Sequence, residues 1–330
     1  MRVENFAMDK EHPKQEIIDK INLLQEKFRS SGQDLSSYLE GLLYADYLTY
    51  WDYINLDTLL SLQKPKTSFK DEKIFIIYHQ ITELYFKLII WELEQIAAEK
   101  NIQLAFFKNR LERVNMYFDQ LISSFAVMWK GMEREQFLKF RMSLLPSSGF
   151  QSAQYRMIEI MCTEIQNLVN IMERDDYRDI NLTSIDSLFG LLYWQFGATE
   201  LATGEKTLTL KNFERKYGNE LKALIADFRH KNLWKQYQNC ADKDAELAGL
   251  LRSLDLKANV HWPLAHYKSA VKYLQKDAIE IAATGGTNWQ KYLPPRFQKV
   301  IFYPELWTEE EMEDWGKSWV EKEVFKVEVV

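Results

Sequence analysis

The 330-residue sequence has little of several residue types that characterise familiar classes of protein. It contains only two cysteines, Cys162 and Cys240, too few for the disulfide framework of a small secreted protein. A reducing, cytoplasmic location is therefore expected. Its 12 glycines and 7 prolines are also sparse, so few turns should interrupt long secondary-structure elements.

The sequence also lacks an excess of positive charge and a long uncharged apolar run. Its formal net charge is -6, whereas nucleic-acid-binding domains usually carry a basic face. Residues 1–16 lack the apolar stretch of a signal peptide. The longest apolar segment, 74–98, is interrupted by Glu83, Lys87 and Glu92, whereas a membrane span needs about 20 mostly uncharged residues. These features predict a soluble protein with no nucleic-acid or membrane partner.

Common catalytic motifs are absent as well. The sequence has no GxGxxG, GxxxxGK[ST], GxSxG or HExxH. It has no pair of Glu-x-x-His motifs for a di-iron bundle, and two cysteines cannot form a cysteine-rich zinc site. Any chemistry must therefore come from isolated residues brought together by the fold.

The sequence is rich in apolar residues at helical spacing. Hydrophobic residues make up 46% and aromatic residues 14% of the chain. Apolar positions recur at i, i+3 and i+4 in most segments, and no alternating strand pattern occurs. We predict an all-α protein with a buried, aromatic-rich interior. The helices are expected within residues 13–30, 35–47, 74–98, 101–131, 133–144, 151–175, 183–203, 208–252, 258–282 and 308–325.

Two of the five histidines occur in apolar helical surroundings. His79 lies in FIIYHQITELYFK (75–87), and His266 lies in HWPLAHYKSAVKYL (261–274). Such a histidine is most often a core residue, but His79 could act in catalysis and His266 could be an axial haem ligand. Glu83 and Lys87 are spaced to form an i, i+4 ion pair.

Arg141 is a candidate for anion binding. It lies about one turn before a break formed by small hydroxyl residues and Gly149, in FRMSLLPSSGF. A guanidinium at such a position can bind a carboxylate through two parallel hydrogen bonds, although a surface arginine near a turn is the simpler interpretation. The TGG stretch at 284–286 could approach an anion closely, or it could be a plain turn.

Six segments in order resemble one family. They are LTYWDYINLDTLLSLQ (48–63), IFIIYHQITELYFKLIIWELEQ (74–95), FRMSLLPSSGFQSAQYRMIE (140–159), WPLAH (262–266), ATGGTNWQKYL (283–293) and FYPELW (302–307). Together they resemble the tryptophan 2,3-dioxygenase family, helical haem proteins that oxidise the indole ring of L-tryptophan. The resemblance covers residues 48–307, the expected haem-binding catalytic domain. A helical arm (1–47), which could be intersubunit, and a C-terminal amphipathic helix and tail (308–330) are expected on either side of it.

The resemblance also implies a haem site. His266, four residues after Trp262, matches the axial ligand of haem b iron. His79 matches the imidazole on the opposite side of the haem, facing the indole N–H of the substrate. Phe75 matches the aromatic residue that packs against the indole, and Ser148 lies where the family lines the pocket near the haem.

Other matched positions concern the amino-acid part of the substrate and the assembly. Arg141 matches the residue that binds the substrate carboxylate, and Thr284 matches the group that meets its ammonium. Tyr50 and Tyr53 match tyrosines that the family contributes to a neighbouring subunit's site. The resemblance therefore implies a homo-oligomer, a dimer or a tetramer.

Four features depart from the family pattern. Phe137 stands where the family usually has a tyrosine whose hydroxyl supports the carboxylate site, and Tyr85 replaces a usual tryptophan. The segment from His266 to Thr284 is longer by about four residues, roughly one helical turn. Residues 287–289 (TNW) follow TGG in place of small residues. The last three departures are expected to cluster around the haem and the closing loop.

These observations predict a haem dioxygenase that acts on L-tryptophan or a close indole derivative with O2 and gives an N-formylkynurenine-type product. The departures leave open a haem monooxygenase or hydroxylase of another aromatic amino acid or substituted indole. A non-catalytic haem sensor or helical interaction protein is a third hypothesis.

Overall fold

The structure, a computed structural model, describes residues 14–44, 49–144, 151–174, 184–199, 205–276, 279–280 and 295–316. The predicted all-α fold is confirmed. Within these ranges the strands are limited to a small antiparallel hairpin, β1 (Gln275–Lys276) with β2 (Ile279–Glu280). Predictions for Ser148, Thr284, residues 287–289 and the tail beyond 316 fall outside the described residues.

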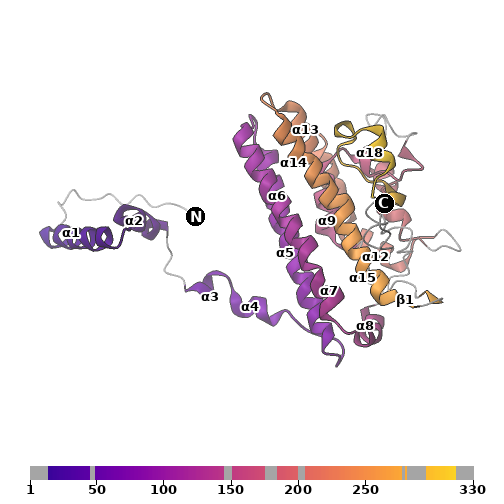
Figure 1. The fold of residues 1–330 in the computed structure, drawn as a ribbon, viewed down its shortest axis with the longest axis horizontal. Helices are drawn as coiled ribbons and strands as arrows, with labels where there is room; N and C mark the ends of the chain where they lie inside the picture. The colour runs from indigo at the N-terminus through magenta and orange to yellow at the C-terminus, as the bar shows by residue number, and fades with distance from the viewer. Residues whose placement is uncertain are drawn as a thin grey trace, which may run out of the picture. The chain divides into compact units, whose positions relative to one another are not determined.

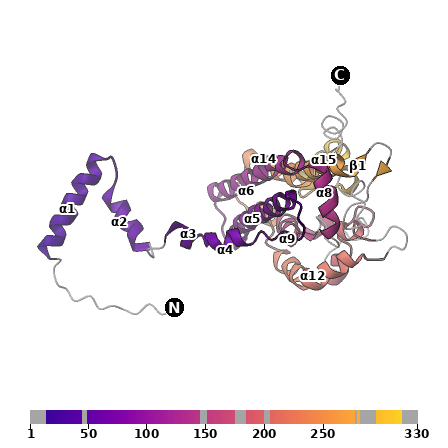
Figure 2. The same ribbon diagram turned by 90° about the horizontal axis from the view of Figure 1, so that it is seen from below.

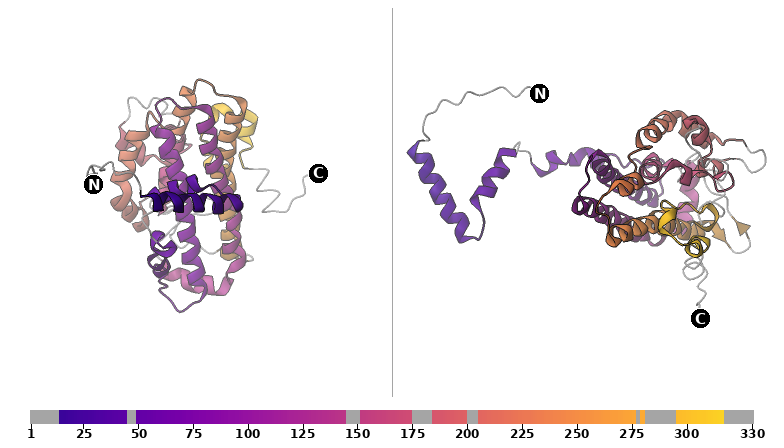
Figure 3. Two further views of the ribbon diagram at one scale, coloured as in Figure 1. Left: turned by 90° about the vertical axis from the view of Figure 1, so that its left-hand side faces the viewer. Right: turned by 90° about the horizontal axis from the view of Figure 1, so that it is seen from above.

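The chain divides into two compact units, Met1–Leu62 and Gln63–Val330. The first contains the helices α1 (Gln15–Ser30), α2 (Leu35–Tyr44), α3 (Tyr50–Tyr53) and α4 (Leu56–Ser61). Helices α1 and α2 form a V-shaped pair (Figure 3), with the Phe28 and Tyr38 rings 5.1 Å apart. Leu35 is the one buried residue in the described part of this unit, which therefore has almost no core of its own. The expected division into arm, catalytic domain and tail stays a prediction.

The second unit is built on long helices. Helices α5 (Asp71–Ala98) and α6 (Leu104–Ser124) lie lengthwise beside the rod formed by α14 (Ala245–Leu256) and α15 (Trp262–Leu274) (Figure 1). Helix α9 (Ala153–Cys162) packs against α5 on one side and against α12 (Leu208–Phe228) on the other (Figure 2). The shorter elements are α7 (Ala126–Gly131), α8 (Arg134–Phe140), η1 (Arg141–Leu144), η3 (Ile165–Leu168), α10 (Ile185–Gly190), α11 (Tyr193–Phe196), α13 (Leu233–Asn239), η6 (Lys257–His261), α17 (Pro295–Gln298), η7 (Pro304–Leu306) and α18 (Glu309–Glu313).

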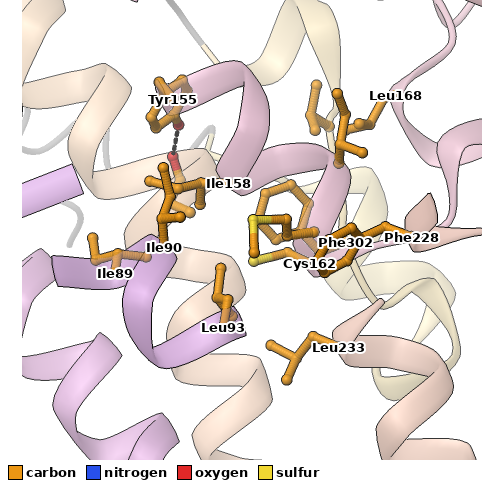
Figure 4. Packing of buried hydrophobic residues seen from close by; sticks show 14 of the residues in the cluster. Ile89, Ile90, Leu93, Tyr155, Ile158, Cys162, Leu168, Phe228, Leu233 and Phe302 are labelled. Atoms are coloured by element: carbon orange, nitrogen blue, oxygen red, sulfur yellow. Dashed lines mark hydrogen bonds between the residues drawn. The ribbon is translucent and has the colours of Figure 1, made fainter. Parts of the chain in front are cut away.

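The main core lies between these helices. Ile89 and Leu93 of α5 and Ile158 and Cys162 of α9 are buried together (Figure 4). Their i, i+4 spacing places each pair on one helix face, which turns inward because apolar surface is removed from water there. Truncating one such aliphatic side chain to alanine typically costs about 2–5 kcal/mol.

Several predicted helices are shorter or divided. The segment 101–131 forms α6 and α7, which meet at the buried Phe125, and 208–252 forms α12, α13 and α14. New helices begin at Asn232 and Asp244, whose side chains accept hydrogen bonds from Lys235 N and Leu247 N as N-caps. The helix expected to reach residue 282 ends at Leu274, because the hairpin follows. Two-residue strands are too short to produce a detectable alternating pattern.

Helix α5 is long and apolar enough to cross a membrane by length and composition, a test that core helices also pass. It contacts α6, α7, α8, α9 and α13. Its buried Glu92 lies 3.0 Å from Arg110 and 3.3 Å from Arg113, both on α6. These contacts place one side of α5 against the rest of the bundle, and the absence of a membrane partner stays a prediction.

Candidate functional site

His79 projects from α5 with its two ring nitrogens in different roles. Its Nδ1 lies 2.7 Å from the carbonyl oxygen of Phe75, one turn earlier. A carbonyl can only accept, so Nδ1 carries the hydrogen and Nε2 is left as an acceptor in the neutral ring. Solvent reaches the side chain, yet the surrounding protein atoms desolvate it and lower the pKa of His79 below its ordinary 6.5. The bond to Phe75 and the charge of Glu83 oppose this shift.

His266 projects from α15 and has a more strongly altered pKa. Desolvation and, as a smaller contribution, the proximity of His79 lower the pKa of His266 from 6.5 to about 4. The two imidazoles are therefore close enough to interact electrostatically. Both are neutral at pH 7, and a neutral imidazole offers the lone pair that a metal ion needs.

An aromatic cluster joins the two histidines. We use this name for the buried Tyr78, Phe125, Met128, Met132, Phe140 and Tyr273, together with Phe75, Phe137 and Trp262 packed against them. The Phe75 ring lies 4.0 Å from His79, and Phe125 lies 5.7 Å from His266. The rings of Tyr78 and Phe125 lie 5.5 Å apart, so ring contacts run from His79 through Tyr78 and Phe125 to His266.

The helical spacing of the sequence creates this arrangement. Phe75 and His79 are four residues apart and share one face of α5, as Trp262 and His266 share one face of α15. Trp262 and His266 both lie beside Phe125, whereas His79 lies beside Phe75 and Tyr78, and Tyr78 in turn contacts Phe125. The fold thus brings two imidazoles from distant parts of the chain to one aromatic region.

Arg141 lies at the edge of this region. It begins η1 directly after Phe140, whose ring is 5.7 Å from that of Phe75. Only 5% of Arg141 is exposed, and desolvation lowers its pKa, although the guanidinium stays charged at neutral pH. Phe137, one turn earlier on α8, lies 6.3 Å from Phe75. The structure therefore groups Phe75, His79, Phe137, Trp262 and His266 and places Arg141 beside them.

The structure locates other expected residues elsewhere. Tyr50 and Tyr53 are 71% and 74% exposed on α3 in the first unit, and their contribution to a neighbouring site stays a prediction. Tyr85 was expected near the haem. Its ring lies 6.5 Å from that of Tyr117 and packs against the main core, and not against the aromatic cluster. Glu83 accepts a hydrogen bond from Gln154 Nε2 at 2.8 Å, and no ion pair forms between the described Glu83 and Lys87. The predicted pairing was wrong.

A separate groove of about 810 Å³ lies between α5, α9 and α12. Glu83 and Gln154 line it, together with acidic residues of α12, but none of the predicted site residues does. Its size alone does not connect it with the chemistry of the two histidines.

Sequence reasoning missed Phe125, Tyr78 and Phe140 as members of the site. Each occupies an ordinary apolar position in a helical pattern, so periodicity could not distinguish it from the core. The break between α6 and α7 places Phe125 beside both Trp262 and His266. No short motif reports such a contact.

The donor set fits a porphyrin-bound iron. Among the described residues, no group of three or more His, Cys, Asp or Glu could hold a metal ion by itself. Haem needs only one protein ligand on one side, because the porphyrin supplies the other four nitrogens. A neutral His266 beside Trp262 and Phe125 offers that ligand with an apolar aromatic wall.

Comparison with known proteins matches this arrangement to one family. The family model for tryptophan 2,3-dioxygenase matches residues 41–245. The tryptophan 2,3-dioxygenase of Bacillus thuringiensis subsp. konkukian is 30% identical over 278 residues, which cover 80% of this chain and 92% of that protein. The chain belongs to the tryptophan 2,3-dioxygenase family. The family member from Ruegeria sp. (strain TM1040) is 44% identical over 117 residues, 35% of this chain and 42% of that protein.

A zebrafish (Danio rerio) relative, tryptophan 2,3-dioxygenase B, is 36% identical over 146 residues, 42% of this chain and 35% of that protein. The range matched by the family model contains Phe75, His79, Phe137 and Arg141. It ends before His266, so the role of that residue depends on its own surroundings.

Proposed function

We propose that this member of the tryptophan 2,3-dioxygenase family is a haem-dependent enzyme that inserts both atoms of O2 across the C2–C3 bond of an indole. The substrate is L-tryptophan or a close indole derivative, and the product is of the N-formylkynurenine type. One observation carries the proposal: two neutral imidazoles, from α5 and α15, share one aromatic cluster in a chain of this family.

His266 is proposed to be the residue that would hold haem b, through a ring nitrogen, with Trp262 and Phe125 beside it. When bound, haem supplies the iron that activates O2. The protein's own contribution is to hold a neutral imidazole in place and to exclude water with aromatic side chains. Both tasks fit the desolvation that lowers the pKa of His266 to about 4.

His79 and Phe75 are proposed to bind the indole. The Nε2 of His79 is an acceptor because Nδ1 donates to Phe75 O, and an indole N–H can only donate. A hydrogen bond between them would fix the in-plane direction of the ring. The Phe75 ring, 4.0 Å from His79, supplies an apolar surface next to that bond.

Arg141 is proposed to bind the substrate carboxylate, and the resemblance assigns Thr284 to the ammonium and Ser148 to the pocket near the haem. A charge-assisted hydrogen bond contributes about 1.5–3 kcal/mol, which corresponds to roughly 10- to 150-fold in binding. Held at both ends, the substrate has its indole ring oriented before reaction, a positioning contribution to catalysis.

A homo-oligomer is proposed because α5 carries an exposed apolar row. The row has five apolar side chains that are between 38% and 58% exposed, spaced alternately four and three residues apart along the helix: Ile77, Ile81, Leu84, Leu88 and Trp91. This is the spacing of residues a and d in helix-to-helix packing. A second copy of the chain is the proposed partner, as a dimer or a tetramer. Light scattering should show a smaller particle for Leu84→Glu, and an unchanged mass would contradict this interface.

A cytoplasmic location is also proposed. Cys162 and Cys240 are both buried and unpaired, as expected for a protein that does not depend on oxidation for stability.

The haem assignment is tested by the visible spectrum of protein produced with ample haem. We expect a Soret band in the wild type, its loss in His266→Ala, and its retention in His79→Ala. The exposed His230 offers a matched control, since His230→Ala should leave the spectrum unchanged. An unchanged ferrous spectrum in His266→Ala would disprove the ligand.

The reaction is tested by incubating the reduced enzyme with L-tryptophan and O2. An N-formylkynurenine product carrying both atoms of labelled O2 supports the proposal, and a hydroxylated product with one labelled atom would overturn it. Arg141→Lys keeps the charge but loses the planar fork, so it should raise KM about 10-fold or more. An unaltered KM would place the carboxylate elsewhere.

A further inference from the structure

Helices α14 and α15 are joined without a break by a π-helical turn, Lys257–His261. The Trp262 N–H donates to the carbonyl of Lys257, five residues earlier, in place of the usual four. The backbone remains right-handed on both sides, with φ/ψ of -65°/-46° at Lys257 and -65°/-51° at Trp262. Such turns are rare and occur mostly as single insertions, often near functional sites.

The π turn determines the direction in which His266 points. One extra residue in a helix of 3.6 residues per turn rotates everything beyond it by about 100° and advances it by about 1.5 Å. His266 lies five residues after the end of the turn. If the turn relaxed to a regular α-helix, the His266 imidazole would leave the side of α15 that faces Phe125.

A buried side chain from α9 binds the middle of this turn. Tyr155 Oη donates to the carbonyl oxygen of Ala258 at 2.7 Å (Figure 4). Ala258 is fully buried and Tyr155 is 8% exposed, so water does not readily replace this bond. A buried carbonyl without a donor is costly, which makes the hydroxyl a specific support for the π conformation.

Two side chains among the first three residues of the turn, and Asp255 before it, make further hydrogen bonds. Lys257 Nζ donates to Asp119 Oδ2 on α6 at 2.7 Å. Asn259 Nδ2 donates to Asp255 Oδ1 at 2.8 Å. Asp255 also accepts from Phe302 N at 2.9 Å and from Trp307 Nε1 at 2.9 Å, so the start of the turn is fixed to the segment 302–307.

We propose that Tyr155 is a positioning residue for His266: its hydroxyl holds the Ala258 carbonyl, keeps the π turn formed and so directs the imidazole toward the aromatic cluster. The inference rests on the proposed role of His266 as the axial haem ligand. Tyr155 touches neither substrate nor haem in this account and acts only through the helix register.

The test is the Tyr155→Phe variant, which removes the hydroxyl but keeps the ring that packs 5.4 Å from Phe86. Haem affinity, measured by titration of the haem-free protein, should fall about 10- to 100-fold, as for the loss of outer groups that orient a metal ligand. The ferrous histidine–iron signature should weaken in parallel. Tyr193→Phe is the control, because it makes the same change to a hydroxyl whose bond, to Glu159 Oε1 at 2.5 Å, lies outside both the π turn and the segment 302–307.

Rescue separates helix register from general stability. Pro263 has no backbone N–H and its ring clashes with the carbonyl four residues earlier, so it does not fit inside a regular α-helix. Deleting Ala258 together with the substitution Pro263→Ala in the Tyr155→Phe background removes the extra residue and lets a regular α-helix return His266 to its present direction. We expect this combined change to recover most of the lost haem affinity. A folded combined variant without recovery, or an equal loss of affinity in Tyr193→Phe, would overturn the proposal.

Amide hydrogen exchange distinguishes failure of this inference from failure of the proposed function. In the haem-free protein, Tyr155→Phe should accelerate exchange at residues 257–266 more than Tyr193→Phe does. A wild type that binds no haem would refute the proposed function, and this exchange experiment would still report on Tyr155. Unchanged exchange and unchanged haem affinity in Tyr155→Phe would refute the positioning role.

Discussion

Two groups of polar side chains in the second unit, one buried in the main core and one beside the aromatic cluster, differ in how their hydrogen-bonding capacity is used. In the main core, Arg156 Nη1 lies 3.1 Å from Glu159 Oε2, and Tyr193 Oη donates to Glu159 Oε1 at 2.5 Å. In the aromatic cluster, His79 donates through Nδ1, and Nε2 accepts no hydrogen bond from any residue that the structure describes.

The comparison separates a structural group from a functional one. Arg156 and Glu159 are almost fully buried, and each finds an opposite charge within the fold. Burial and the Arg156 charge act in opposite directions on the pKa of Glu159, and burial raises it overall. The imidazoles of His79 and His266 instead lose charge and keep an unused acceptor. A desolvated polar atom without a hydrogen-bond partner in the fold is available to bind a ligand.

The largest expected effect comes from breaking the structural pair. Arg156→Met leaves Glu159 buried without its partner, which should lower the free energy of unfolding by about 3–5 kcal/mol. Urea denaturation followed by circular dichroism measures this loss. The double variant Arg156→Met, Glu159→Leu should recover much of the stability, because an apolar pair of similar volume replaces the ions.

The assignment of Arg156 to the structural group would be wrong if Arg156→Met kept its stability but lost haem or tryptophan binding. Arg156 would then serve the site, contrary to its contacts in the core. The ferrous spectrum of the folded variant therefore needs to be recorded alongside its stability.

A smaller effect is expected inside the aromatic cluster from Phe137→Tyr. The Phe137 ring lies 4.6 Å from Tyr273 and one turn before Arg141, where the family usually has a tyrosine. A new hydroxyl that supports the carboxylate site should lower KM for L-tryptophan about fivefold, since one neutral hydrogen bond contributes about 1 kcal/mol. Phe69→Tyr, at the edge of the same cluster, is the matched control. Equal or weaker binding in Phe137→Tyr would show that the carboxylate lies elsewhere.

The sequence predicts the helices of both regions but not the contacts that separate them. Periodicity identifies α5 and α15 because their apolar residues recur with the turn of the helix. It cannot show that Phe125 ends up between Trp262 and His266, since that depends on how three helices pack. Nor can it reveal a π turn at 257–261, because five residues are too few for a change in apolar periodicity to be read.

The smallest expected effect concerns pH and tests the unused acceptor of His79 directly. Protonation would turn Nε2 into a donor that could not accept the indole N–H, and desolvation lowers the pKa of His79 below 6.5. A group titrating at its ordinary value would be half protonated at pH 6.5, so kcat/KM there would be about half of its value at pH 8. The lowered pKa instead predicts kcat/KM above that half, with the decline displaced to more acidic pH. A tryptophan methylated on the indole nitrogen has no N–H to donate, so its slower turnover should not show the same inflection. A midpoint at or above 6.5 that disappears in His79→Ala would mean that this imidazole is not desolvated. The distinction between the paired core residues, Arg156 and Glu159, and the imidazole would then fail.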